Sequence, residues 1–503
     1  MTNHLILFPI INQLVFAIVM LFLWRRSGWQ KLFSIIGGFT GLGIAISVFV
    51  TIWNDGIIIY NAGNWEAPFG ITFVGDMLSA TLVLLTAICG MTVSMFSAGS
   101  VDKDRLSFGY FPIFHFLLLG LNGAFLTGDI FNLYVWFEMI IISSFVLITL
   151  GGEKKQLEGA IKYFTLNIFA SVMFLTAIAV LYGLTGTLNM ADLSLKIAAI
   201  ENRGLVEITG FLFLVGFGIK SAIFPLYFWL PASYHTPPPA ISAIFGGLLT
   251  KLGVYALIRT FTLIFVGNEF LDIVILILGA LTLFSGALGA LVQNNLTKMF
   301  SYLIICHIGY MILGLGLHTE LAIAAVIFYL IHDIIVKSNV FMISGLIYRI
   351  KGTYSMRELG GMYAKYPLLS IVMIISFFSL VGIPPLSGFW PKLSLITESI
   401  QVKGGIWFVL AILFGTFMTL FIIAKMWANV FWKSGRIKIR KNEFLYFKDV
   451  KLLHKIEMIV PIVFLAFVSL YIGFGAENIQ QLSMRIADEL INNQQYIQAV
   501  LKK

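Results

Sequence analysis

Ionisable side chains occupy the centres of long apolar segments in this chain. Placing a Lys or Asp at the centre of a bilayer costs about 2.5–3.5 kcal/mol on insertion scales, so such groups face one another or internal water rather than lipid. Side chains that gain and lose protons in this setting could pass protons from one to the next. The candidates for proton transfer are Glu138, Lys220, Lys251, His332, Lys337 and Lys392.

Amines outnumber carboxylates among these central positions. Glu138 and Asp333 supply the central carboxylates, against the lysines named above and Lys425. Any one lysine could pair statically with a carboxylate, but the whole set cannot be neutralised in this way. Burial disfavours the charged form of an amine, whereas a nearby carboxylate favours it, so the proton occupancy of such lysines can switch. The pattern predicts a proton relay, with static pairing as the structural alternative.

Other ionisable residues are weaker candidates. Lys162 and Arg259 lie near segment ends, where long side chains extend their charged groups to the membrane surface. His307 fits a relay and a packing role equally well, whereas His235 suits a loop cap and His115 a packing role. No Cys/His cluster has metal-ligand spacing and no glycine-rich phosphate loop follows a strand, so we expect neither a metal nor another cofactor.

Prolines interrupt two of the apolar segments beside two of the lysines. Proline removes a backbone hydrogen bond and frees carbonyl groups, which a membrane tolerates only where protein or a water-filled cavity covers them. The sequence therefore predicts broken helices next to Lys220 and Lys392. The expected break positions are Pro225, Pro384 and Pro385.

Composition places the chain in a lipid bilayer. Of its 503 residues, 59% are hydrophobic and only 11% are charged, too few to cover a soluble protein of this size. Apolar stretches of about 20 residues recur from end to end, so we predict an all-α polytopic membrane protein with about 14 transmembrane helices. The expected segments are 4–24, 32–53, 70–98, 108–128, 129–150, 161–184, 206–232, 240–265, 271–292, 301–317, 321–348, 366–399, 405–432 and 456–476.

Basic loops predict the orientation. Clusters of Lys and Arg follow the first, eleventh and thirteenth segments, which places all of them on one side, and basic loops remain in the cytoplasm. We therefore expect a multi-pass protein of the cell (cytoplasmic) membrane with both termini outside. The net charge of +9 is explained by these loops without a nucleic-acid partner. The basic positions are Arg25, Arg26, Lys31, Arg349, Lys351, Arg357, Lys365, Lys433, Arg436, Lys438, Arg440, Lys441, Lys448, Lys451 and Lys455.

The seventh and twelfth segments share a Pro-Leu, Trp and Pro pattern around their breaks. Broken helices at matching places in two halves indicate an inverted repeat, with incidental kinks as the alternative. The expected units are 1–107 with the first three helices, 108–265 and 271–432 as two inverted five-helix repeats, and 433–503 with the basic loop, the last helix and a tail. Within the tail, 477–503 is expected to form a short interfacial helix.

Several motifs resemble the antiporter-like subunits of respiratory complex I and of Mrp-type multisubunit cation/proton antiporters. The resemblance covers about residues 70–430, and the motif across the seventh and eighth segments is the most specific part of it. The matching stretches are Pro225 to Tyr255 with Trp229, Pro231, His235, Pro239 and Lys251, Glu138 after an aromatic run, Asn295 to Tyr310, the pair His332 and Lys337, and Gly382 to Lys392.

The resemblance implies a fourteen-helix fold in which each of two inverted five-helix repeats contains one broken helix. It also implies that Glu138 and Lys220 form the ion pair of one half-channel and that Lys392 is the terminal exit group. Lys251, together with His332 and Lys337, would make the central connection. The implied role is that of a transporter subunit rather than an enzyme, which works with other subunits, carries H⁺ and Na⁺ and serves pH homeostasis.

Within this family the chain is most similar to D-type Mrp subunits. Its length argues against the long A-type subunits, and Lys392 stands where the complex I subunit of similar length generally has Glu. The shorter N-type complex I subunit also has Lys there, so a proton-pumping membrane subunit of a complex I-type NADH:quinone oxidoreductase remains the alternative. Asn294 and Asn295, before Lys298, depart from the acidic residue often found there.

Overall fold

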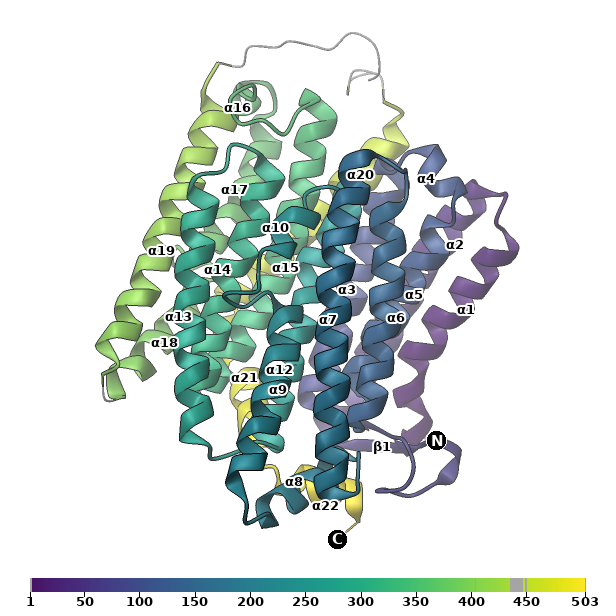
Figure 1. Ribbon diagram of the computed structural model, residues 1–503. Helices are drawn as coiled ribbons and strands as arrows, with labels where there is room; N and C mark the ends of the chain where they lie inside the picture. The colour runs from purple at the N-terminus through teal and green to yellow at the C-terminus, as the bar shows by residue number, and fades with distance from the viewer. Residues whose placement is uncertain (1, 403, 435–446, 448–449, 503) are drawn as a thin grey trace.

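The structure is a computed structural model that describes all residues except 1, 403, 435–446, 448–449 and 503. Part of the basic loop expected after the thirteenth segment therefore lies outside the described residues, namely Arg436, Lys438, Arg440, Lys441 and Lys448. The described chain is a bundle of roughly aligned helices with both termini at the same end (Figure 1). An even number of crossings follows from that placement of the ends.

The N-terminal part combines two peripheral helices with a small hairpin. β1 pairs antiparallel with β2, and the Asp76 side chain that follows accepts a hydrogen bond from the Ser79 N–H at 2.9 Å, which caps α3. The third apolar segment therefore starts as a strand, and its helix begins later than the residue 70 that hydropathy indicated. The elements are η1 (Thr2–Leu7), α1 (Phe8–Phe22), α2 (Ser27–Asp55), β1 (Ile58–Asn61), η2 (Ala62–Asn64), β2 (Thr72–Gly75), α3 (Met77–Ser100) and α4 (Lys103–Ser107).

The central part contains the helices that position the candidate residues. The elements are α5 (Tyr110–Leu126), α6 (Ile130–Thr149), α7 (Lys154–Thr185), α8 (Met190–Ala199), α9 (Arg203–Ser221), α10 (Trp229–Ser233), α11 (Pro239–Ile244), the π-helical turn η3 (Phe245–Leu249), α12 (Thr250–Leu263), α13 (Glu269–Leu291), α14 (Leu296–Leu317) and α15 (Glu320–Lys351).

The C-terminal part completes the bundle. Residues 477–503, expected to form one short interfacial helix, form most of α21 and α22. The elements are α16 (Met362–Lys365), α17 (Pro367–Val381), α18 (Phe389–Gln401), α19 (Ile406–Trp427), the π-helical turn η4 (Ala428–Trp432), α20 (Leu452–Phe474), α21 (Ala476–Ile491) and α22 (Gln494–Leu501).

The described helices match the predicted membrane crossings. Twelve of them are long and apolar enough to span a bilayer, and the two shorter apolar helices α5 and α17 occupy the other predicted positions. The expected breaks are also present. Pro225 lies between α9 and α10, and Pro384 and Pro385 lie between α17 and α18. The all-α polytopic fold with a broken helix in each half is confirmed.

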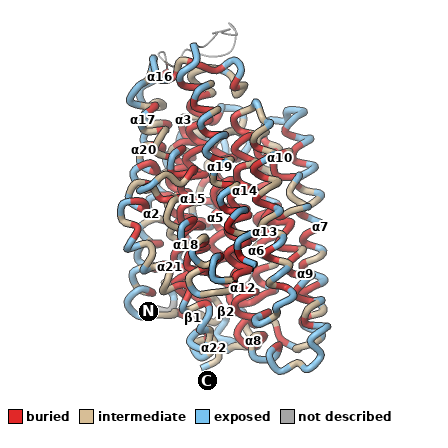
Figure 2. The backbone as a smooth tube through the Cα atoms, turned by 90° about the vertical axis from the view of Figure 1, so that its left-hand side faces the viewer, coloured by how far each residue is buried: buried red, intermediate tan, exposed pale blue. Residues whose placement is uncertain are grey.

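Burial separates an inner group of helices from an outer one. In their most apolar 18-residue windows, α14 and α15 are 94% buried, whereas α1 and α2 are 33% buried. Figure 2 shows the buried residues concentrated along the interior of the bundle and the exposed ones on its periphery. A helix that is apolar on all sides and buried on all sides lies in the core of a bundle. The long helix α15 therefore forms its axis.

Arg259 does not extend to the membrane surface, contrary to the sequence expectation. Its guanidinium group pairs with the Asp76 carboxylate at 2.6 Å, with only 4% of each side chain exposed. Tyr496 of α22 covers it, with the guanidinium carbon 5.3 Å from the ring centroid. The tail thus folds back over this pair and removes it from solvent. Lys162 is exposed as expected and pairs with Glu158 at 2.6 Å.

The contact between α21 and the start of α3 predicts how the stability of the protein depends on pH. Glu489 accepts a hydrogen bond from the Met77 backbone N–H at 3.1 Å, and burial raises the pKa of Glu489 to about 7. The folded chain therefore keeps this proton up to about pH 7, whereas an unfolded chain releases it near the ordinary value of 4.5. Stability should fall as pH rises through this window, because the folded state binds the extra proton.

Glu489→Gln should remove this part of the pH dependence. The measurement is the thermal unfolding midpoint of the purified protein between pH 5 and 8, with the exposed Glu477→Gln on the same helix as the control. If the unfolding midpoints of the wild type and of Glu489→Gln fall equally as pH rises, the Glu489 carboxyl group does not titrate in the docked helix.

Candidate functional site

Lys220 lies at the end of the first half of a broken helix. α9 ends one residue after it, and the indole N–H of Trp229, across the break, donates to the Ile219 carbonyl at 2.9 Å. The Lys220 ammonium donates to the Ser171 hydroxyl at 3.2 Å and lies 4.7 Å from the centroid of the Phe137 ring. The break therefore holds a buried amine against a hydroxyl and an aromatic face.

Glu138 and Lys220 are expected to meet either directly or through one water molecule. The direct ion pairs of the described residues do not include these two side chains. Glu138 is only half-buried, and its Oε1 atom has no hydrogen-bond partner in the described part of the chain. Contact between the two groups through one water molecule stays a prediction.

A small cavity of about 20 Å³ adjoins Lys220. Its lining includes Tyr163 and Asn167 of α7 and, on the far side, Leu249 and Leu252, which flank Lys251. A cavity of this size holds about one water molecule, provided that polar groups can bond it. The cavity therefore offers a position for a water molecule beside Lys220.

Lys251 stands after a π-helical turn. The wider turn of η3 leaves the Gly246 carbonyl free to accept a hydrogen bond from the Lys251 ammonium at 2.6 Å. The same ammonium pairs with the Asp333 carboxylate of α15 at 2.7 Å, and both side chains are fully buried. A Cβ atom at Gly247 would collide with the Ser338 hydroxyl, so only glycine allows η3 and α15 to approach this closely.

Asp333 joins three helices and was not among the predicted proton-transfer residues. Its other oxygen accepts from His307 Nδ1 at 2.9 Å, so α12, α14 and α15 meet at one carboxylate. His307, which the sequence left undecided, therefore belongs to the site. The central position of Asp333 beside His332 indicated a buried carboxylate in the sequence. The sequence did not indicate which side chains would bond it.

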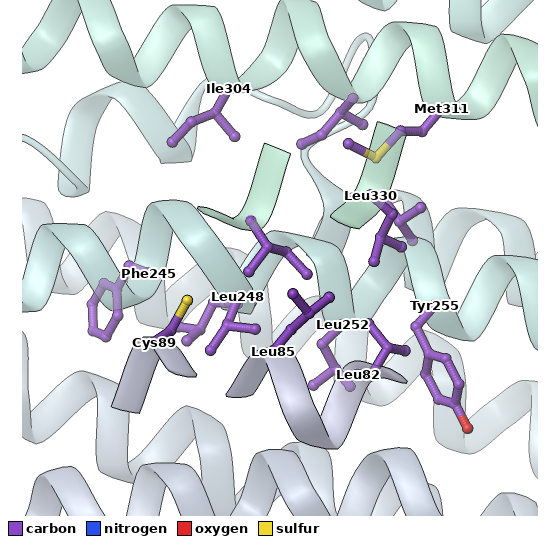
Figure 3. Packing of buried hydrophobic residues seen from close by; sticks show 14 of the residues in the cluster. Leu82, Leu85, Cys89, Phe245, Leu248, Leu252, Tyr255, Ile304, Met311 and Leu330 are labelled. Carbon is purple, nitrogen blue, oxygen red and sulfur yellow. The ribbon is translucent and has the colours of Figure 1, made fainter. Parts of the chain in front are cut away.

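Apolar packing isolates this centre from water. Side chains of α3, of η3 and α12, and of α14 and α15 fill the space between these elements, as Figure 3 shows. Low-dielectric surroundings strengthen each electrostatic interaction inside and make an unpaired charge costly. The residues labelled there are Leu82, Leu85, Cys89, Phe245, Leu248, Leu252, Tyr255, Ile304, Met311 and Leu330.

Lys392 has an arrangement that corresponds to that of Lys220 at the second break. Its ammonium donates to the Val381 carbonyl, the last of α17, at 2.7 Å. It also lies 5.1 Å from the centroid of the Tyr310 ring. Tyr310 stacks on Tyr329, whose ring is 5.6 Å from that of His332. The rings of Tyr310 and Tyr329 therefore form a continuous contact from Lys392 to His332.

Lys337 and His332 lie on α15 between these groups. The Lys337 ammonium is fully buried and has no hydrogen-bond partner among the described residues. His332 contacts the second break, where its Nδ1 atom bonds the Ser387 hydroxyl at 2.8 Å. A Cβ atom at Gly388 would meet the imidazole at 3.0 Å, so the ring lies directly against this glycine.

Except for Glu138, which is half-buried, the predicted proton-transfer residues are all buried inside the bundle. Lys220, Lys251, Lys337 and Lys392 are each at most 4% exposed, and Asp333 is the fully buried carboxylate among them. Charging all four amines at once would leave several positive charges uncompensated in a low-dielectric interior. The arrangement can thus exist with different numbers of bound protons.

Of two further histidines, His115 has the expected packing role, whereas the loop cap expected of His235 stays a prediction. His115 is fully buried, and its ring nitrogens bond the Ser34 hydroxyl at 3.0 Å and the Gln13 side chain at 2.7 Å. His235 precedes α11 in the loop between the broken helix and α12. In the described part of the chain, no group of three His, Cys, Asp or Glu side chains is placed to hold a metal ion.

Comparison with known proteins identifies the family. The transmembrane family described as NADH:quinone oxidoreductase/Mrp antiporter matches residues 127–419, more than half of the chain. The chain belongs to this family. The match includes every predicted proton-transfer residue, from Glu138 to Lys392, whereas α20 and α21 lie beyond it.

Relatives within the family match over their full length. The chain is 41% identical to the Na⁺/H⁺ antiporter D subunit of Alkalihalophilus pseudofirmus and 39% identical to that of Bacillus subtilis, in each case over 100% of both chains. It superposes on a chain of the Mrp complex of Dietzia sp. DQ12-45-1b with a TM-score of 0.90, at 27% identity and with 99% of each chain covered. A chain of an archaeal membrane-bound sulfane sulfur reductase gives a TM-score of 0.87 at the same identity and coverage.

The three-helix junction at Asp333 predicts a stability effect. Asp333→Ala would leave the Lys251 ammonium buried without its carboxylate, at a cost of about 3–5 kcal/mol. Asp333→Asn should cost less because the amide still bonds its neighbours. Lys251→Met should then be less harmful in the Asp333→Asn background than in the wild type, because the pair is removed together.

Thermal unfolding of the purified variants measures these effects. Asp272→Ala is the matched control, because Asp272 also pairs with a histidine, His318 at 3.4 Å, but is partly exposed. Equal destabilisation by Asp333→Ala and Asp272→Ala would contradict the assignment of Asp333 as the buried counter-charge.

Proposed function

We propose that this chain is the proton-translocating subunit of a multisubunit Na⁺/H⁺ antiporter, a secondary transporter rather than an enzyme. The observation that carries the proposal is the set of four buried lysines with one fully buried carboxylate among them. The names of the full-length relatives at 39–41% identity support the antiporter over the complex I-type alternative. That alternative rests on the broader family description, which includes both classes.

The proposed route runs through the buried groups in the order in which they lie. Glu138 attracts a proton to Lys220, water in the adjoining cavity connects Lys220 with Lys251, and Asp333 holds the charged form of Lys251. Lys337 and His332 continue along α15, and Lys392 at the second break releases the proton. Hydroxyl, carbonyl and aromatic groups contact the amines at both breaks, so each amine keeps a partner in either protonation state.

Glu138 supports the presence of a neighbouring subunit. It is half-buried on the lateral face of α6, with exposed Val135 and Ile142 nearby on the same helix. A carboxylate at the lipid boundary in the middle of a spanning helix is costly, whereas the same group under a partner helix is not. We therefore place another subunit of the complex against α6.

The membrane setting follows from the same chain. We propose that the protein resides in the cell membrane, and that the end of the bundle with the basic residues that flank α2, α15 and α20 faces the cytoplasm, in line with the positive-inside rule. Both termini then lie outside. The functional units are the first three helices (1–107), the repeats 108–265 and 271–432, and the segment 433–503.

The decisive experiment is cation/proton exchange in membrane vesicles, followed by the response of a pH-sensitive dye to added Na⁺. Alanine at Glu138, Lys220 or Lys392 should lower the exchange rate by roughly 100-fold or more, because a relay cannot bypass a missing proton carrier. Lys251→Ala should keep part of the activity if water enters the space that the side chain leaves.

Lys162→Ala is the matched control, because this lysine is 52% exposed and lies outside the buried set. Immunoblots for partner subunits verify that each variant complex is assembled. Exchange at the wild-type rate by Lys220→Ala would overturn the relay. NADH-driven proton pumping without Na⁺-dependent exchange would favour the complex I-type alternative.

A further inference from the structure

A chain of buried hydroxyl groups extends from His332 away from the lysines. The Ser387 hydroxyl bonds His332 Nδ1 at 2.8 Å and the Ser469 hydroxyl at 3.2 Å. Ser469 in turn donates to the Ser379 hydroxyl at 2.9 Å. All four side chains are fully buried, so bulk water does not compete for these hydrogen bonds.

The four hydrogen-bonded residues come from four separate parts of the fold. His332 lies on α15, Ser387 in the second helix break, Ser469 on α20 and Ser379 on α17. α20 lies outside both proposed repeats and beyond the matched family region. It approaches the break so closely that a Cβ atom at Gly473 would lie 2.8 Å from the Ser387 nitrogen. This close contact is what brings Ser469 within reach of Ser387.

The number of hydrogens that each hydroxyl group can donate fixes the donor and the acceptor of each hydrogen bond in this series. A hydroxyl group has one hydrogen to donate. Ser469 gives its hydrogen to Ser379, so the bond between Ser387 and Ser469 requires the hydrogen of Ser387. Ser387 then has none left for the imidazole and must accept from His332, which places the imidazole hydrogen on Nδ1.

The other ring nitrogen of His332 is consequently the one with the free lone pair. Nε2 has no hydrogen-bond partner among the described residues. It lies against Gly388 in the second break, where a Cβ atom on the glycine would approach Nε2 at 3.0 Å. A proton that reaches His332 can therefore be accepted at Nε2, while Nδ1–H stays bonded to Ser387.

We propose that Ser387 and Ser469 are positioning residues that fix the tautomer of His332 and so make Nε2 its proton-accepting atom. This inference rests on the proposed relay function of His332. Protonation of Nε2 gives an imidazolium ion whose Nδ1–H bond to Ser387 is charge-assisted and stronger. Release of the same proton from Nε2 restores the starting tautomer, so protons and hydrogen bonds balance over one cycle.

Nitrogen-15 NMR of histidine-labelled complex in liposomes at alkaline pH tests the tautomer directly. Subtraction of the His332→Gln spectrum isolates the signals of His332, whose protonated and unprotonated ring nitrogens resonate far apart. The expected wild-type signal is Nδ1–H with bare Nε2. Ser469→Ala frees the Ser387 hydrogen to turn toward Nδ1, so a shift toward the Nε2–H tautomer is expected.

Exchange assays on the same variants measure the consequence. Ser469→Ala should lower the rate roughly 10- to 100-fold, the range for losing a group that orients a reactive histidine. Ser469→Thr keeps a hydroxyl group and should restore both the rate and the tautomer. Ser370→Ala is the control, because Ser370 is equally buried on α17 but donates only to its own helix, to the Tyr366 carbonyl at 2.9 Å.

The two measurements separate the possible failures. An Nε2–H tautomer in the wild type, or an unchanged tautomer in Ser469→Ala, overturns the positioning role and leaves the relay standing. Wild-type exchange by Lys220→Ala overturns the relay itself, whatever the tautomer of His332. If Ser469→Ala prevents assembly while Ser469→Thr does not, the wild-type spectrum decides alone: an Nδ1–H tautomer supports the positioning role, and an Nε2–H tautomer overturns it.

Discussion

The free energy of burying charge controls this structure. Lys251, Asp333 and His307 meet at the centre of the bundle with none of their side-chain surface exposed, and each satisfies part of the hydrogen-bonding need of the next. An ammonium group and a carboxylate in such surroundings are stable only as a pair with good geometry. The packing of α12, α14 and α15 follows from that requirement, because all three helices contribute to a single carboxylate.

Away from this centre, two amines are bonded to neutral acceptors. Lys220 bonds the Ser171 hydroxyl group and Lys392 the Val381 backbone carbonyl. A neutral acceptor bonds an amine whether or not the amine is charged, whereas a carboxylate favours only the charged form. Backbone carbonyls outside the regular hydrogen-bond pattern serve Lys392 at the second break and Lys251 at the π-helical turn, whereas the Ser171 hydroxyl of α7 serves Lys220. The buried lysines whose protonation can change therefore lie beside irregular backbone.

Segments outside the two proposed repeats complete the interior. α20 brings Ser469 to the second break, and the tail covers the pair of Arg259 and Asp76 with Tyr496. Both contacts remove polar groups from surroundings where they would otherwise lack partners. The C-terminal helices thus supply partners to buried polar groups and also cover the outside of the bundle.

Residue type and spacing alone determined the membrane class, the helix order, both breaks and the lysines of the interior. These features are local, because hydropathy over about 20 residues and a proline in a helix act within one segment. The tertiary structure decided which groups meet. Asp333 pairs with Lys251 and His307, Arg259 turns inward to Asp76, and Glu138 stays short of direct contact with Lys220. Such pairings join segments far apart in the chain, and only the packing of the helices sets the distances between them.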